Sequence, residues 1–303
     1  MPELPEVETI RGQLAPLVEG RSIERLQILD SRWCRPLEPR ELSAALQGRR
    51  VQRLGRRGKY LVWELSEDVY LVQHLRMTGA VLAAPQPEPP HTRVRIALGA
   101  RRGSARGSAA TRRAEGEPLS LAIVDPRRFG TGELLLGGDA LEEFFAARLG
   151  LEPFDERFDD AHLRALTRGR TAPIKALLLD QRRIAGVGNI YADEALFRAR
   201  IHPRRPAGSL TAAQISALRV ALVDALSAGI DARGATIEDF RHVDGVRGSF
   251  QDQFLVHRRA GQPCPQCGGV VVKMVVAGRG TYVCELCQKP PRARRRRAQA
   301  ASS

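Results

Sequence analysis

The stretch KYLVWELSEDVYLVQH, residues 59–74, has the pattern of two β-strands joined by a short turn. Residues 59–65 and 69–74 are rich in β-branched and aromatic side chains, and a polar segment separates them. Two further runs, 93–98 and 119–124, have the same character and are bounded by Gly and Pro clusters. Several short strands at this spacing predict a β-sandwich or a barrel.

Helical periodicity appears on both sides of these strands. Before them, apolar residues at Val7, Ile10, Leu14 and Leu17 predict a helix over residues 5–18. After them, the pattern is helical from about residue 139, where Asp139 fits a helix cap. The chain therefore reads as a β domain followed by a helical domain.

Within the helical part, Thr211-Ala-Ala-Gln214 has the form of a capping box, which predicts a helix reaching about Ala228. A glycine-rich turn, residues 186–189, lies between two shorter helical segments at 173–180 and 190–198. Such a turn at the start of a helix can direct backbone amides toward a phosphate, or it can simply be a tight interhelical connection.

Four of the five cysteines form the pattern C-x2-C-x16-C-x2-C, at Cys264, Cys267, Cys284 and Cys287. Two such knuckles on a hairpin supply the four thiolates of a tetrahedral zinc site, and two redox pairs are the alternative. Residues 270–272 and 281–283 fit the hairpin strands. We expect one structural Zn²⁺ with no open coordination position, and ordinary packing for Cys34.

The chain has 303 residues and a formal charge of +14, from 48 Lys and Arg against 34 Asp and Glu. A composition of 43% hydrophobic and 27% charged residues fits a folded protein, and no uninterrupted apolar run is long enough to span a membrane. The acidic N-terminus lacks the features of a secretory signal, so we expect a cytoplasmic protein. The excess charge predicts a polyanionic partner such as nucleic acid, or merely a solvated basic surface.

Two segments have the composition of flexible chain. Residues 100–117 are rich in Gly, Ser, Ala and Arg, and form an insertion between two predicted strands. Residues 289–303 contain six basic residues and no acidic one. Much of the net charge therefore lies in these two segments.

Pro2 is the first residue for which the sequence suggests a chemical role. Methionine before a small residue is normally removed, which would leave a secondary amine that can attack an electrophilic carbon and form an iminium. Glu3 beside it can act as a general acid. The alternative is a helix start, because Pro and Glu are both favoured before the first turn of an amphipathic helix.

Three turns add to this reading. Residues 56–60 bring Lys59 to the start of a strand, residues 74–79 carry Met77, and residues 125–130 present two arginines and an aromatic ring. An apolar wedge beside an arginine can unstack a base and fill the space it leaves. Taken one at a time, each segment also fits an ordinary β-turn.

Together these segments resemble formamidopyrimidine-DNA glycosylase, in the superfamily shared with endonuclease VIII. The matching segments follow the family's order and cover residues 2–288: Pro2–Thr9, Arg57–Tyr60, His74–Gly79, Asp125–Gly130, Ile174–Asp180, Gly186–Tyr191 and the four-cysteine ribbon. The N-terminal sequence Pro2-Glu-Leu-Pro-Glu resembles the formamidopyrimidine branch more closely, because endonuclease VIII proteins usually begin Pro-Glu-Gly-Pro-Glu.

The resemblance implies an α+β fold of two domains. An N-terminal β-sandwich with a flanking N-terminal helix precedes a helical domain that contains a helix–two-turns–helix motif and a β-hairpin zinc finger. The expected limits are 1–137 for the catalytic domain with its insertion at 100–117, 138–260 for the helical domain, 261–288 for the zinc finger and 289–303 for a disordered basic tail.

The resemblance also implies catalytic roles. Pro2 is the expected nucleophile at C1′ of the damaged nucleotide, and Glu3 the acid that helps to open the sugar. Lys59 assists elimination and binds phosphate, and Arg279 supports the second elimination at the reacting phosphates. Glu6 matches a second family carboxylate near the base pocket.

The remaining roles concern DNA binding. The implied contact residues are Met77, His91, Arg127, Phe129, Arg170, Lys175 and Asn189. The resemblance implies that Met77, Arg127 and Phe129 fill the space left by the extruded base, with Arg127 facing the orphaned cytosine. The other four residues hold the DNA backbone, Asn189 within the helix–two-turns–helix motif.

The chain departs from the family pattern at Arg233, Ala235 and Ser249. The first two lie in the loop over the flipped base, and all three bear on lesion preference. We expect a monomeric glycosylase and lyase that acts on double-stranded DNA with oxidised purines, working in the cytoplasm at the nucleoid. The alternatives are an endonuclease VIII-like specificity for oxidised pyrimidines and a non-catalytic binder of damaged DNA.

Overall fold

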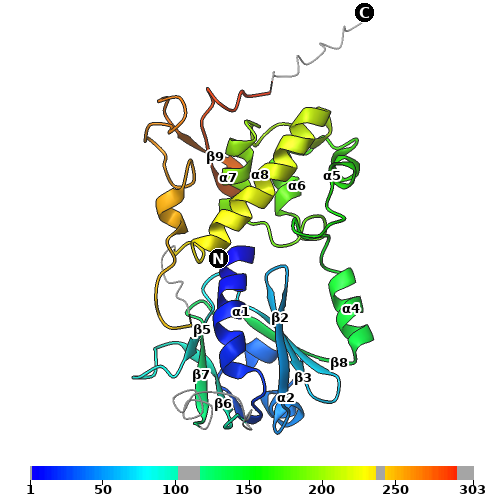
Figure 1. Ribbon diagram of the computed structural model, residues 1–303, viewed down its shortest axis with the longest axis vertical. Helices are drawn as coiled ribbons and strands as arrows, with labels where there is room; N and C mark the ends of the chain where they lie inside the picture. Colours follow the sequence, from blue (N-terminus) through cyan, green and yellow to red (C-terminus); the bar gives the residue numbers. More distant parts are fainter. Residues whose placement is uncertain (1, 102–116, 237–242, 292–303) are drawn as a thin grey trace, which may run out of the picture. The chain divides into compact units, whose positions relative to one another are not determined.

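The computed structural model describes residues 2–101, 117–236 and 243–291 (Figure 1). The chain forms two compact units. The first, here the sheet unit, contains residues 1–155, 180–188 and 223–253. The second, here the helical unit, contains residues 156–179, 189–222 and 254–303.

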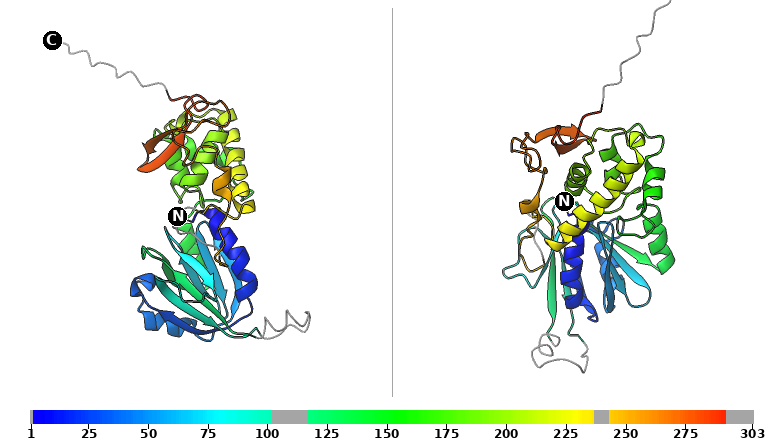
Figure 2. Two further views of the ribbon diagram at one scale, coloured as in Figure 1. Left: turned by 90° about the vertical axis from the view of Figure 1, so that its left-hand side faces the viewer. Right: turned by 45° about the horizontal axis from the view of Figure 1, so that its top comes forward.

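The sheet unit contains two four-stranded antiparallel sheets (Figures 1 and 2). The first has the order β1 (Ile23–Ile28), β6 (Thr92–Leu98), β7 (Leu119–Val124) and β5 (Ala80–Ala83). The second has the order β2 (Val51–Arg57), β3 (Tyr60–Leu65), β4 (Val69–His74) and β8 (Thr131–Leu136). The four strands expected from the sequence are the central strands of these sheets, and the four edge strands were not predicted individually.

One hydrophobic core joins both sheets, which confirms the sandwich. Residues Val94 and Ile96 of β6 and Trp63 of β3 are at most 1% exposed and belong to one buried cluster. Helix α1 (Leu4–Val18) adds Ile10 to the same core, close to the bounds predicted for it. Helix α1 is therefore packed against the core of the sandwich.

Helix α4 (Gly138–Ala146) covers the outer face of the second sheet. Its Phe144 and Phe145 pack edge-to-face against each other and against Tyr60 of β3. The predicted cap at Asp139 is wrong, because Gly137 occupies the cap position with φ 89° and Asp139 lies in the first turn. Helix α2 (Pro39–Leu46) was also not predicted from the sequence.

The helical unit contains α5 (Asp160–Thr167), α6 (Ile174–Leu179), α7 (Asn189–Arg198), the first part of α8 (Ala212–Asp231), and the hairpin of β9 (Val272–Val276) and β10 (Arg279–Val283). The predicted capping box is present, because Thr211 and Gln214 exchange hydrogen bonds between side chain and backbone. The first hairpin strand begins later than predicted, at Val272 instead of residue 270.

Helix α8 is, among the described helices, long and apolar enough to cross a membrane by length and composition. Its Leu218, Leu222 and Leu226 are 0% exposed inside the protein. Burial of these side chains accounts for part of the apolar composition.

Each of the two units is built from three segments of the chain. Residues 180–188 and the second part of α8 belong to the sheet unit, although they lie between segments of the helical unit in sequence. Of the two segments predicted to be flexible, residues 102–116 and 292–303 lie outside the described residues.

Candidate active site and nucleic-acid interface

Pro2 and Glu3 lie at the start of α1, and both are buried. Glu3 is the N-cap of the helix and forms a capping box with Glu6, whose Oε2 accepts a hydrogen bond of 2.8 Å from Glu3 N–H. Pro5 occupies the first turn. The helix-start reading of this sequence is therefore correct for Glu3 and Pro5, and the cap holds the residue next to Pro2 in one position.

The glycine-rich turn expected at residues 186–189 packs against this helix start. Leu4 N–H donates to Gly186 O at 3.1 Å. A Cβ atom at Gly188 would lie 2.2 Å from Glu3 Cδ, and one at Gly186, whose φ is +86°, would lie 2.5 Å from Leu4 Cδ1. Glycine is thus required here by close contact with the Pro2–Glu3 segment.

Lys59 reaches the same turn. Its side chain is 5% exposed, and its Nζ donates to Val187 O at 3.0 Å. The carbonyl of Val187 also accepts a bond of 2.8 Å from Gln181 Nε2. Lys59 and Glu3 are therefore both held against the residue 186–188 turn, within the sheet unit.

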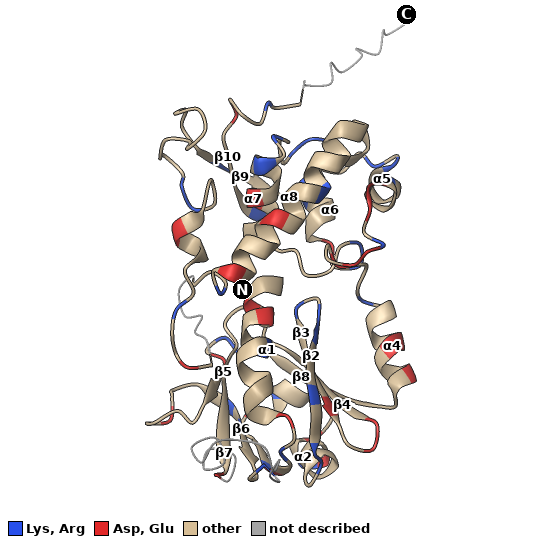
Figure 3. Cartoon of the chain, viewed as in Figure 1, with Lys and Arg blue, Asp and Glu red and all other residues tan. Residues whose placement is uncertain are grey.

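A partly buried ion pair holds the chain just before Lys59. Arg56 donates to both carboxylate oxygens of Glu152, at 2.9 and 2.8 Å, and Gly58 N–H donates to the same group at 2.6 Å. Burial works against the charge on Arg56, but Glu152 and Glu8 outweigh it and raise the pKa of the guanidinium. Figure 3 shows basic residues gathered at this β2–β3 turn and acidic residues at the start of α1.

Glu6 connects the helix start to the loop that follows α8. Its Oε1 accepts a hydrogen bond of 2.7 Å from Ala235 N–H, while Oε2 accepts from Glu3 N–H. Gly234 has φ +76°, and a Cβ atom there would lie 2.8 Å from Glu6 Cγ. This carboxylate therefore fixes the position of the loop with the unusual residues Arg233 and Ala235.

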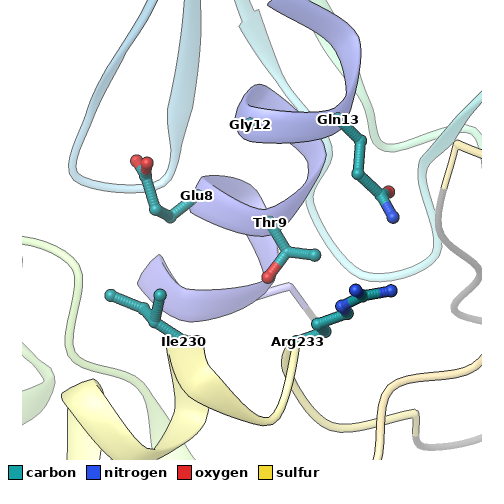
Figure 4. A pocket seen from close by; sticks show the side chains of 6 residues that line it. All are labelled: Glu8, Thr9, Gly12, Gln13, Ile230 and Arg233. Carbon is teal, nitrogen blue, oxygen red and sulfur yellow. The ribbon is translucent and has the colours of Figure 1, made fainter.

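A cavity of about 440 Å³ lies beside this loop, between α1 and the end of α8 (Figure 4). It is lined by Glu8, Thr9, Gly12, Gln13, Ile230 and Arg233. The Thr9 hydroxyl donates to Pro5 O, and Gln13 Oε1 accepts from Val243 N–H. Residues 237–242, which continue the loop, are outside the described part of the chain.

The predicted wedge residues lie on two turns joined by one buried carboxylate. Asp125, 2% exposed, accepts hydrogen bonds from the Thr78 hydroxyl at 2.5 Å and from Gly130 N–H at 2.7 Å. Met77, next to Thr78, is half-buried, whereas Phe129 is 51% exposed. An apolar side chain this exposed on a fixed turn is available to contact a base.

Arg127 and His91 are also exposed in the sheet unit. The Arg127 guanidinium lies 4.9 Å from the centroid of the Phe129 ring, a cation–π arrangement. His91 adopts φ 67°, and its backbone carbonyl accepts from Asp125 N–H at 3.1 Å. Asp125 therefore holds the backbone beside both residues.

In the helical unit, Asn189 begins α7, and its Nδ2 donates to Gly280 O at 2.9 Å. Its Oδ1 is buried without a hydrogen-bond partner among the described residues. Arg170 is half-buried near the end of α5, with Nε donating to Leu166 O at 2.6 Å. Arg279 is exposed at the start of β10.

Lys175 is enclosed within the helical unit. Its side chain is 0% exposed, and its Nζ lies 2.6 Å from Asp193 Oδ1 and 2.8 Å from Thr281 Oγ1. An ammonium group enclosed and paired in this way has no free face for a phosphate. The burial therefore argues against a direct DNA contact by Lys175.

The four cysteines of the ribbon converge, with all Sγ atoms within 4.8 Å of one another. Cys264 and Cys287 Sγ lie 3.9 Å apart, and Cys267 and Cys284 Sγ 3.5 Å apart. Tetrahedral Zn²⁺ with Zn–S bonds of about 2.3 Å requires sulfur separations of about 3.8 Å. The arrangement thus fits one structural zinc with four protein ligands.

The structure brings the predicted residues together in two groups. The sheet unit holds Pro2, Glu3, Glu6, Lys59, Met77, His91, Arg127 and Phe129, and the helical unit holds Arg170, Lys175, Asn189, Arg279 and the four cysteines. Sequence reasoning missed Asp125, Glu152 and Asp193 as positioning groups. Only Asp193 left a signal, because it and Glu194 are acidic residues in a helix segment that is otherwise largely apolar.

Comparison with known proteins agrees with this arrangement. Three family models match: the formamidopyrimidine-DNA glycosylase N-terminal domain at residues 1–132, the formamidopyrimidine-DNA glycosylase H2TH domain at 149–241, and a zinc finger found in FPG and IleRS at 261–290. The formamidopyrimidine-DNA glycosylase of Thermus thermophilus is 43% identical over 290 residues, which cover 95% of this chain and 98% of the relative.

Two solved structures show the same fold. The crystal structure of MutM (Fpg) from Thermus thermophilus matches with a TM-score of 0.80 and 42% identity, over 95% of this chain and 98% of that one. The wild-type Lactococcus lactis enzyme matches with a TM-score of 0.84 and 33% identity over 95% and 100%, in a complex with N7-benzyl-Fapy-dG DNA. The Lactococcus enzyme has also been solved with DNA that contains an oxidised pyrimidine. The chain therefore belongs to the formamidopyrimidine-DNA glycosylase family.

Proposed function

We propose that this chain is a bifunctional DNA glycosylase and lyase of base excision repair that removes formamidopyrimidines and 8-oxoguanine opposite cytosine. The observation that carries the proposal is that the Gly186–Gly188 turn contacts both Glu3, the residue after the buried Pro2, and the Nζ of Lys59. A fixed amine beside a carboxyl group and an ammonium group is the set that iminium chemistry needs.

The proposed reaction begins with attack of the Pro2 nitrogen on C1′, which expels the damaged base while Glu3 supplies a proton to the sugar. The resulting iminium is an electron sink and acidifies the C2′ proton. Loss of that proton expels the 3′ phosphate by β-elimination, and a δ-elimination then releases the 5′ phosphate. Lys59 and Arg279 stabilise the leaving phosphates as preorganised cations.

DNA binding follows from the exposed groups. Met77, Phe129 and Arg127 fill the space left by the extruded nucleotide, because two are apolar and the third is a guanidinium stacked on Phe129. His91, Arg170 and Asn189 hold the DNA backbone, and we propose that Lys175 contributes indirectly. The zinc ribbon supports Arg279, and the protein acts as a monomer in the cytoplasm, at the nucleoid.

An endonuclease VIII-like preference for oxidised pyrimidines is the second candidate. It is favoured by Arg233 and Ala235 in the loop that Glu6 holds, because these residues replace a family glycine and a family hydroxyl. The Lactococcus relative's complex with an oxidised pyrimidine adds support. Cleavage of matched 8-oxoguanine and thymine-glycol duplexes separates the two, and a faster reaction on thymine glycol would favour this candidate.

The chemistry is tested by borohydride trapping on an 8-oxoguanine duplex. We expect wild-type protein to crosslink and Pro2→Gly to lose the crosslink, since a primary amine lacks the ring that fixes the nucleophile. Mass spectrometry of the mature N-terminus checks that Met1 is removed. A wild type that binds damaged DNA without crosslinking or nicking would instead identify a non-catalytic binder.

A further inference from the structure

The helical unit buries a cluster of titratable side chains that the proposed reaction does not use. Lys175 is 0% exposed, Asp193 1% and His257 5%. Charged groups are buried at a cost unless they are paired and hydrogen-bonded, so the position of each partner matters. The partners of this cluster lie beside Arg279.

Asp193 on α7 uses both carboxylate oxygens. Its Oδ1 pairs with Lys175 Nζ at 2.6 Å, and its Oδ2 lies 2.9 Å from His257 Nδ1. Tyr282 N–H donates to the same Oδ2 at 3.4 Å. One carboxylate therefore joins α6, α7, the segment before the ribbon and strand β10.

Lys175 continues the connection along β10. Its Nζ donates to Thr281 Oγ1 at 2.8 Å and reaches Gly280 O at 3.5 Å. The same Gly280 carbonyl accepts from Asn189 Nδ2 at 2.9 Å. Residues 280–282, directly after Arg279, are thus held by three side chains of the helices.

The hairpin needs such support. It is a two-stranded ribbon, which is marginally stable alone, and its tip contains Ala277 at φ 50° and Gly278 at φ 70°. Arg279 is exposed at this tip. Without contacts to residues 280–282, its guanidinium would sample many positions relative to Asn189 at the start of α7.

We infer that Lys175, Asp193 and His257 form a positioning cluster, which fixes Arg279 relative to Asn189. Both residues then contact the same DNA backbone in one defined arrangement. This rests on the proposed role of Arg279 in the δ-elimination. None of the three is a catalytic residue, and each acts through β10. Lys175 matters for the reaction without touching DNA.

The test uses the zinc-loaded full chain and a duplex with a preformed abasic site. The ratio of the β,δ-product to the β-product is measured, because it does not depend on the fraction of protein that is folded. We expect Asp193→Asn to lower this ratio roughly tenfold and Thr281→Val about threefold, since small misplacements of a reacting group are costly. Thr281→Val removes one hydrogen bond without unpairing a charge, so it remains informative if Asp193→Asn is unstable.

Two controls isolate positioning from general damage. Leu163→Ala opens a cavity in α5 of the same unit, and Arg219→Ala removes a surface ion pair with Asp160. Both should keep the wild-type product ratio. A lowered ratio in Leu163→Ala, or a wild-type ratio in both cluster variants, would overturn the inference.

Arg279→Ala separates this inference from the function on which it rests. If it leaves the ratio unchanged, the proposed role of Arg279 is wrong and the inference is overturned with it. If it lowers the ratio while the cluster variants do not, only the inference is overturned. The salt dependence of binding adds a second check in an Arg279→Ala background, where displacement of Arg279 no longer counts. A Lys175 ammonium that neutralised a phosphate directly would make the added Lys175→Met substitution reduce the logarithmic salt slope by about 0.9, and we expect no further reduction.

Discussion

Gly188 lies against the carboxyl group of Glu3, and its lack of a side chain is what permits this approach. The sequence suggested a phosphate-binding turn at these residues, and the structure adds a steric role, because Gly186 and Gly188 enclose the segment that carries Pro2. Gly188, which has no functional side chain, therefore helps to set the position of the Glu3 carboxyl group, next to Pro2 in the chain.

We expect Gly188→Ala to slow borohydride trapping about 100-fold while zinc content and folding persist, because the added methyl group must displace Glu3. Gly138→Ala is the matched control, since a Cβ atom there meets Tyr70 Oη at an ordinary 3.7 Å. Trapping rates measured at saturating protein give the comparison. A wild-type rate for Gly188→Ala would show that Glu3 can move without consequence.

His74 gives a prediction for pH. Burial lowers the pKa of its ring to about 3, and the charges of Arg76 and Lys59 add to the effect. The unfolded ring has a pKa near 6.5, so between these values only the unfolded chain takes up the proton. The stability contribution is therefore complete above about pH 6.5 and is lost as the pH falls toward 3, by at most about 1.4 kcal/mol per pH unit.

We expect His74→Gln to flatten this loss of stability between pH 6.5 and 4, measured by urea unfolding at a series of pH values. Val72→Ala on the same strand lowers stability through a cavity, so its curve should run parallel to that of the wild type. Equal slopes for wild type and His74→Gln would contradict the assignment of a neutral, buried ring.

At the scale of elements, the sequence predicted the central strands and missed the edges. Strands β3, β4, β6 and β7 are covered on both sides by neighbours and read clearly as apolar runs. Edge strand β2 has a neighbouring strand on one side only, and four of its seven residues are exposed or partly exposed. Edge positions tolerate polar residues and short lengths, which removes the signal that periodicity detects.

Residues of the site could be predicted only where a short local motif indicates a single role. Local patterns drew attention to Pro2, Glu3, the cysteine ribbon and Phe129, and the resemblance to the family implied the roles of Pro2, Glu3 and Phe129. The pairs that hold them join residues far apart in sequence, such as Arg56 with Glu152 and Thr78 with Asp125. No local pattern marks such a pair, and the burial of Lys175, from which we infer a positioning role, exists only in the folded chain.

Asp125 connects the turns that carry Met77 and Phe129, here called the wedge turns. A substitution of Asp125 therefore tests whether the two turns act together. We expect Asp125→Asn to destabilise the fold by about 1–3 kcal/mol, because it disturbs buried hydrogen bonds to Thr78 and Gly130. Base excision from an 8-oxoguanine duplex should fall further than cleavage at a preformed abasic site, since extrusion costs least where no base is stacked.

Single-turnover rates on the two duplexes, measured where the variant is folded, check this prediction. Phe129→Ala removes the exposed ring alone and should change the two rates in the same direction. An equal fall on both duplexes in Asp125→Asn would mean that the turns serve a later step than extrusion.

At the scale of the whole molecule, the net charge of +14 says little about the site. The groups proposed to touch DNA are single cations held in set places, such as Lys59 against Val187 and Arg279 after the hairpin tip. Residues 292–303 alone carry five arginines and no acidic residue. We therefore expect the net charge to affect overall DNA affinity without affecting which lesion is cleaved.

We expect deletion of residues 292–303 to weaken binding to undamaged duplex and to reduce its salt dependence, by up to about 0.9 in the logarithmic slope for each phosphate that the tail no longer neutralises. The ratio of excision rates on 8-oxoguanine and thymine-glycol duplexes should stay as in the full chain, because the wedge turns and the Glu6-held loop belong to the sheet unit. Titrations at several salt concentrations and single-turnover rates measure the two effects. A changed lesion ratio would show that the tail takes part in reading the damaged base, since a purely electrostatic contact acts on every sequence alike.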